Sequence, residues 1–222
     1  VNVTGVLSIQ TLITNVTGHF AYFAEEIMKR DYAAAMTFFV FIIFFLFGAF
    51  ISNFLSELVS KKHPNLHHVI PISIEITILI GVAIFGVQTE LGSNEGKWVA
   101  SSMLFAMGMQ NALVTKISKS TVRTTHLTGL FTDLGIELSQ LFFYKKPEER
   151  KRLKKSIYLR LSIIAFFFIG CISGGFIYNA LQLKTLFVAA TFLLIALLYD
   201  YIRLSFFVIK RKAIFKKAIL NK

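Results

Sequence analysis

Long apolar runs separated by short charged blocks dominate the chain. The runs approach or exceed the roughly 20 residues that an α-helix needs to cross the hydrocarbon core of a bilayer. They cover residues 33–55, 69–88, 98–115, 157–181 and 185–208. The first run carries no charge, and Glu75 is the one charged residue of the second. This pattern predicts an all-α integral membrane protein, a single polytopic membrane domain over residues 1–222.

Two short motifs occur twice along the chain. The sequence TNVTG at Thr14–Gly18 recurs as THLTG at Thr125–Gly129, and Gly48-x-x-x-Ser52 recurs as Gly170-x-x-x-Gly174. Internal repeats in a chain this apolar are typical of membrane transporters. We expect a first repeat over about residues 1–92, a second over about 97–209, and a basic cytoplasmic tail over 210–222. Small residues four apart also predict close helix packing at both glycine pairs.

The two Thr-Gly segments leave the topology open between two arrangements. Residues 11–28 and 121–143 are long enough to be helices, but they carry Thr, Asn or His together with acidic residues. If they span the bilayer, each repeat has four spans and the repeats are parallel. If they enter the bilayer as half-helices, each repeat has three spans and the repeats are inverted.

The distribution of Lys and Arg favours three spans per repeat. With the N-terminus inside, four blocks rich in Lys and Arg lie on the inner side, namely residues 61–62, 116–123, 145–155 and 210–222. The basic residues on the outer side are then Lys29, Arg30, Lys97 and Lys184. This agrees with the excess of positive charge found in cytoplasmic loops. We therefore predict six transmembrane helices in two inverted three-helix repeats, each with a re-entrant or broken Thr-Gly helix, and both termini in the cytoplasm.

Composition excludes several classes of function. Hydrophobic residues make up 55% of the chain, and the formal net charge is +12. The basic residues gather at helix ends without interleaved aromatic residues, so we expect no nucleic-acid partner. The single cysteine, Cys171, excludes an intrachain disulfide and a multi-cysteine metal site. The chain has no phosphate-binding loop and no clear nucleophile with a His/Asp set. We expect neither an enzyme nor a cofactor or metal.

The duplicated Thr-Gly motifs are the candidate substrate site. Thr and Asn cap helices, and a half-helix that begins there would direct its N–H groups toward the bilayer centre, where two such ends could form a midplane site. The alternative is that the hydroxyl groups bond within ordinary spans and the glycines pack helices. With three nearby amides included, the candidate substrate-binding residues are Asn2, Thr14, Asn15, Thr17, Gly18, Gln110, Asn111, Thr125, His126, Thr128 and Gly129.

Two acids inside apolar runs are candidates for proton coupling. Glu75 and Asp200 lie in the third span of each repeat. A carboxylate within a span costs about 2.5–3.5 kcal/mol on insertion scales, so it usually faces the protein interior or water. Arg203 lies three residues after Asp200 and could neutralise it. Glu75 has no such neighbour, which favours Glu75.

These stretches resemble the signature segments of YoaK-type bacterial membrane proteins. The resemblance rests on Val1-Asn2, Thr14–Phe20, Gly108–Ala112 and Thr124–Gly129, and it covers nearly the whole chain. Many relatives carry Asp where Asn2 stands and Asn where His19 stands. The resemblance implies a six-helix protein of the bacterial inner membrane, and it supplies neither a substrate nor a catalytic residue.

We expect a small secondary transporter or permease for an unidentified small solute, embedded in the lipid bilayer. If one copy of this length is too small to transport the solute alone, we expect a homodimer. The alternative is a non-transporting membrane module that binds lipid or a partner protein. The basic segment 144–156 is interpreted as a solvated cytoplasmic loop, with anionic lipid headgroups as its other potential contact. We also interpret Val1–Val3 as the tail of a first helix that matches the helix before Thr125.

Overall fold

A computed structural model describes residues 1–62, 66–86, 93–118 and 127–220, with side chains described as far as Arg203. Over these residues the chain forms helices and no strand. The α-helices are α1 (Asn2–Ile9), α2 (Val16–Met28), α3 (Tyr32–Ser60), α4 (Val69–Phe85), α5 (Asn94–Ile117), α6 (Leu127–Phe143), α7 (Pro147–Leu181) and α8 (Thr185–Leu220). A short 3-10 helix, η2 (Gln182–Lys184), joins the last two.

The helices α3 and α5 form the closest pair in the bundle. They run in the same direction, because Gly48 meets Phe105 near their middles and Lys116 reaches Glu57 near their ends. A Cβ atom on Gly48 would collide with the carbonyl oxygen of Phe105, and one on Gly108 would collide with the carbonyl oxygen of Phe45. Glycine on both helices therefore lets the two backbones touch, as the Gly48-x-x-x-Ser52 pattern predicted.

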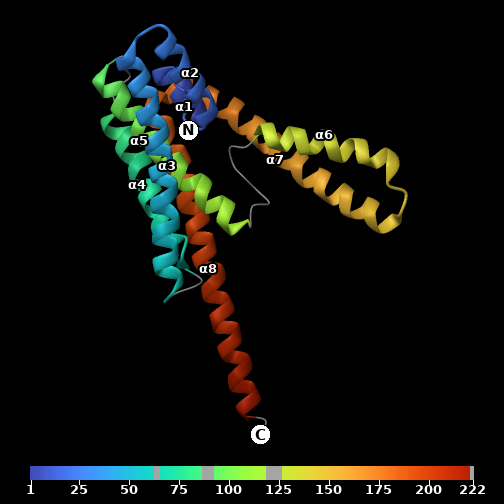
Figure 1. The fold of residues 1–222 in the computed structure, drawn as a ribbon. Coiled ribbons are helices and arrows are strands. Elements are labelled where there is room, and N and C mark those ends of the chain that lie inside the picture. Colours follow the sequence, from blue (N-terminus) through green and yellow to red (C-terminus); the bar gives the residue numbers. More distant parts are fainter. Residues whose placement is uncertain (63–65, 87–92, 119–126, 221–222) are drawn as a thin grey trace.

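The helices α4 and α8 complete a core against this pair (Figure 1). Phe41, Leu79, Met103, Leu104 and Leu186 are fully buried and come from α3, α4, α5 and α8. The apolar runs at 33–55, 98–115, 157–181 and 185–208 are helical, and the run at 69–88 is helical as far as Phe85. The all-helical prediction is therefore confirmed.

Within the described residues, two helical stretches are long and apolar enough to cross a membrane by length and composition, Tyr32–Ser60 and Pro147–Arg203. The helix α4 is apolar but has 17 residues. These features are consistent with a helical membrane protein. The number of spans, the inversion of the repeats and the cytoplasmic termini stay predictions.

The second half of the chain is arranged differently from the first. The α6–α7 hairpin extends away from the bundle, whereas its counterpart α2–α3 lies within it (Figure 1). Arg160 on α7 holds this hairpin together, with its guanidinium 2.8 Å from a carboxylate oxygen of Asp133 and 3.0 Å from one of Glu137. Both acids come from α6 and lie four residues apart, so one Arg neutralises two carboxylates on one helix face.

The prediction of close packing at Gly170 and Gly174 is wrong for the described residues. No atom of a neighbouring element lies within 4 Å of a Cβ built on either glycine. The helix that reaches this part of α7 is α1 from the first half of the chain, where Val3 lies 3.8 Å from a Cβ built on Gly175. Among the described residues, the same small-residue pattern thus produces tight packing at Gly48 and not at Gly170 or Gly174.

The different environments of Gly48 and Gly170 can be compared by a matched pair of substitutions. Gly48→Ala should force α3 and α5 apart, because its new methyl group would meet fixed backbone, and overpacking of this kind typically costs about 1–3 kcal/mol. Gly170→Ala adds the same methyl group to open space on α7 and should leave stability unchanged or slightly raised. Thermal unfolding of the purified protein in one detergent measures both. Equal losses in the two variants would contradict the close α3–α5 contact.

Candidate functional site

The chain reverses direction sharply between α1 and α2. Gln10 ends α1 in the left-handed region, with φ of 52°, and the following residues fold back along α1, so that Ile13 packs on Gly5. The new helix α2 then begins after Asn15, whose side-chain oxygen accepts a hydrogen bond from Gly18 N at 3.0 Å. The sequence predicted a helix start at this motif, and the Asn15 cap is in place.

Asn2 holds the reversal through its carboxamide. Its Oδ1 atom accepts hydrogen bonds from the backbone N–H groups of Ile13 at 2.9 Å and Thr14 at 3.3 Å. These N–H groups belong to a segment outside helices, so without Asn2 they would lack a partner in apolar surroundings. Asn2 is therefore a structural anchor of the broken element, and Thr14 contributes to the site through its backbone.

His19 fixes the other side of the same segment. Its Nε2 atom lies 2.7 Å from the carbonyl oxygen of Leu12, and its ring packs on Phe38 and Phe41. Because a carbonyl oxygen accepts, Nε2 carries the proton and Nδ1 is the acceptor of the neutral ring. Nδ1 is buried and has no hydrogen-bond partner among the described residues. Our site prediction left out His19. The sequence signal for its contact with the segment before α2 was a lone His in an apolar helix.

The start of α2 lies at the depth of the middle of α3. His19 stands opposite Phe38 and Phe41, and Val16 begins the helix one turn earlier. Since α2 and α3 are antiparallel neighbours, Val16 lies beside the centre of the apolar run 33–55. With 13 residues, α2 is about 20 Å long, which is shorter than the roughly 30 Å hydrocarbon core. The helix α2 is therefore too short to cross that core by itself.

The second Thr-Gly motif lies elsewhere. The helix α6 begins at Leu127, with Thr128 exposed and Gly129 partly buried, while Thr125 and His126 lie outside the described residues. The helix α6 packs on α7, whereas α2 packs on α3. The helices α2 and α6 lie well apart in Figure 1. The expected meeting of the two helix starts across one midplane site is thus corrected: each motif begins a helix in a separate hairpin.

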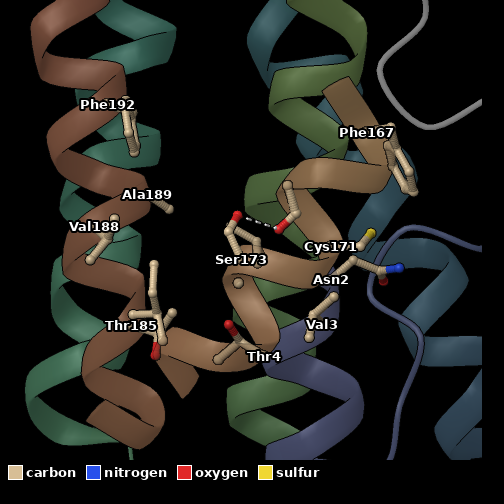
Figure 2. Close-up of a pocket in the computed structure, with 14 residues that line it drawn as sticks. Asn2, Val3, Thr4, Phe167, Cys171, Ser173, Thr185, Val188, Ala189 and Phe192 are labelled. Atoms are coloured by element: carbon tan, nitrogen blue, oxygen red, sulfur yellow. Dashed lines mark hydrogen bonds between the residues drawn. The ribbon is translucent and has the colours of Figure 1, made fainter. Parts of the chain in front are cut away.

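A cavity of about 340 Å³ lies between the first turn of α1, the C-terminal half of α7 and the start of α8 (Figure 2). Ser173 from α7 and Thr185 from α8 stand on opposite walls, while Thr4 of α1 borders the gap. The Ser173 hydroxyl is engaged by the carbonyl of Ile169 at 2.8 Å. The hydroxyl of Thr185 is buried and has no hydrogen-bond partner among the described residues. Most of the lining is apolar, so this space fits a small, weakly polar molecule better than an ion.

Asn2 connects the cavity to the reversal, since it borders the first and anchors the second. Thr4 and Thr185 were missed by the sequence prediction, because a single Thr in an apolar run gives no signal of its own. Asn15 and Thr17 are exposed on α2, and Gly18 meets the Asn15 side chain. Gln110 and Asn111 are partly buried near the end of α5.

The two candidate proton-coupling acids have different environments. Glu75 is 1% exposed inside the bundle, and its Oε1 atom has no hydrogen-bond partner among the described residues. Asp200 Oδ2 lies 2.8 Å from Nε2 of His68, so its partner is His68 and not the expected Arg203. Burial lowers the pKa of His68, although the charge of Asp200 opposes this shift. Near pH 7 the contact is therefore a hydrogen bond from a neutral imidazole to a carboxylate.

Within the described parts of the chain, no three His, Cys, Asp or Glu side chains are grouped so that they could hold a metal ion. The arrangement has apolar helices, a broken element at mid-depth and a small cavity beside it. Such an arrangement is consistent with a helical membrane protein.

The chain belongs to the family described as Protein of unknown function (DUF1275), whose model matches residues 1–199. Searches of curated proteins and of solved structures found no match to the chain.

Two substitutions separate the hydrogen-bonding role of Asn2 from the shape of its side chain. Asn2→Leu removes the acceptor of two backbone N–H groups, and leaving buried donors unpaired costs about 1–3 kcal/mol. Asn2→Asp keeps an oxygen acceptor in the same place and should retain most of the stability. Thermal unfolding of both variants in one detergent checks the expectation. Equal stability of Asn2→Leu and the unchanged protein would show that the hydrogen bonds do not anchor the reversal.

Proposed function

We propose that this chain is a YoaK-type permease of the bacterial inner membrane that moves a small, weakly polar solute. The α1–α2 reversal carries this proposal. Broken helices that end near the middle of a membrane domain are typical of transporter binding sites, because irregular backbone at that depth is tolerated where it lines a cavity or is buried in protein.

In this proposal the solute binds beside the reversal, in the cavity bordered by Asn2, Thr4 and Thr185. Thr185 lines this cavity and has a hydroxyl without a hydrogen-bond partner among the described residues, and the apolar walls exclude highly charged molecules. The close α3–α5 pair serves as a rigid support, while the α6–α7 hairpin has fewer neighbours and is free to move relative to it. Both chain termini lie in the cytoplasm.

Glu75 is the proposed proton carrier. It lies in the bundle without a cationic partner among the described residues, so protonation changes its charge without breaking an ion pair. A carboxylate in such a place is costly while charged, and solute binding that admits water would favour its ionisation.

Uptake into proteoliposomes tests the proposal directly. A panel of small metabolites is offered to the purified full-length chain, with and without an inward proton gradient. We expect gradient-stimulated uptake of a weakly polar solute. Glu75→Gln should remove the stimulation by the gradient while leaving the helical content intact, because it keeps the shape and loses the titrating group. Asp200→Asn, the matched control, should keep the stimulation.

Two results would contradict the proposal. One is an absence of uptake for the whole panel by protein that retains its thermal transition after reconstitution. The other is a solute whose uptake is unchanged when Thr185→Val removes the hydroxyl group in the cavity.

A non-transporting module that binds lipid or a partner protein is the second candidate. The observation that favours it is the large apolar surface of α7, on which Phe166, Phe168 and Phe176 are each more than 60% exposed. This candidate predicts protein or lipid retained through purification and no uptake of solute.

A further inference from the structure

The first turns of α7 carry an unpaired basic face. Lys151, Lys154 and Lys155 are exposed, and none of them forms an ion pair among the described residues. With Tyr158 they follow the spacing i, i+3, i+4 and i+7, so all four lie on one side of the helix. Tyr158 is 75% exposed.

The opposite side of the same helix faces α6. Ser156 donates a hydrogen bond to Glu137 at 2.6 Å, and Arg160 pairs with Asp133 and Glu137. The two acids of α6 are thus used on the inner face, where Arg160 neutralises them, and Glu149 at the start of α7 pairs with Lys146. The outer face keeps three lysines whose charges have no protein counterpart within the part of the chain that is described.

The basic face changes along α7 into an apolar one. Continuing the same helical side beyond Tyr158 leads to Ile169, Ile172 and Phe176, which are 59%, 47% and 73% exposed. From Lys155 to Phe176 the helix rises about 30 Å, which matches the thickness of the hydrocarbon core. A stripe that runs from Lys through Tyr to exposed apolar residues has the order of a helix crossing from headgroups to acyl chains.

Aromatic residues at the tip of the hairpin support the same placement. Phe142 and Phe143, the last residues of α6, are 83% and 80% exposed next to the first turn of α7. Aromatic side chains beside lysines are typical of the membrane interface, and an anionic headgroup layer attracts each nearby basic residue by about 1 kcal/mol.

We propose that this face of α7 binds anionic phospholipid headgroups through Lys151, Lys154 and Lys155, with Tyr158 at the boundary between headgroups and acyl chains. The partner is a lipid because the basic patch continues directly into an exposed apolar stripe of membrane length. A soluble anion would use the lysines without that stripe. The site is independent of solute transport.

The test measures the apparent dissociation constant of the detergent-solubilised full chain for dioctanoyl-phosphatidylglycerol, with dioctanoyl-phosphatidylcholine as the neutral comparison. The variant replaces Lys151, Lys154 and Lys155 together by Gln. At low salt we expect binding of the anionic lipid to weaken roughly fivefold per lysine, on the order of a hundredfold in total. Binding of the neutral lipid should be unchanged, and about 1 M salt should reduce the difference between the proteins.

A second triple variant removes the same charge from other exposed positions, by Lys61→Gln, Lys62→Gln and Lys184→Gln. This variant should retain binding of the anionic lipid. Replacing the three α7 lysines by Arg should also retain it, and provides a folded reference that keeps the charge. Equal weakening in both Gln triples would overturn the proposal in favour of a general charge effect. Unchanged affinity of the α7 triple, or equal affinity of the unchanged protein for both lipids, would overturn it outright.

Discussion

The contact between the α3 and α5 backbones is the constraint on which the rest of the described bundle depends. In an apolar solvent, helices gain little from burying apolar side chains, so close van der Waals contact between backbones must supply the association. Gly48 and Gly108 provide it from both sides. The helix α2 then packs on α3, and α4 packs on α5, so that the position of the α1–α2 reversal follows from this pair.

The helices and the start of each Thr-Gly helix could be predicted from the sequence, because apolar runs and capping residues are local signals. The packing partner of each glycine pair could not. Gly48 and Gly170 occupy the same pattern, yet Gly48 meets a 24-residue helix and Gly170 meets none among the described residues. What differs is the neighbour opposite each glycine, α5 at Gly48 and none among the described residues at Gly170, and no residue near either glycine encodes it.

The candidate site was predicted only in part, because only local signals can be read from the sequence. Asn15 caps α2 as its residue type suggested, and Asn2, a candidate substrate-binding residue by sequence, accepts hydrogen bonds from the backbone of the reversal. Its action on Ile13 and Thr14 depends on a reversal at Gln10, where a non-glycine residue adopts a positive φ. That conformation has no sequence signature, and the separation of α2 from α6 is a property of the tertiary arrangement alone.

The distribution of acids explains why the two halves of the chain differ in chemistry. Among the described acids of α4, α6 and α8, Asp133 and Glu137 share Arg160, and Asp200 contacts His68. Moving a proton onto any of these three weakens an existing contact. Glu75 lacks a hydrogen-bond partner at Oε1 and lies where charge is costly. Protonation of Glu75 therefore breaks no existing contact of that oxygen. The two acids of α6 therefore stabilise the α6–α7 hairpin, whereas Glu75 in the bundle has the environment on which its proposed role as a proton carrier rests.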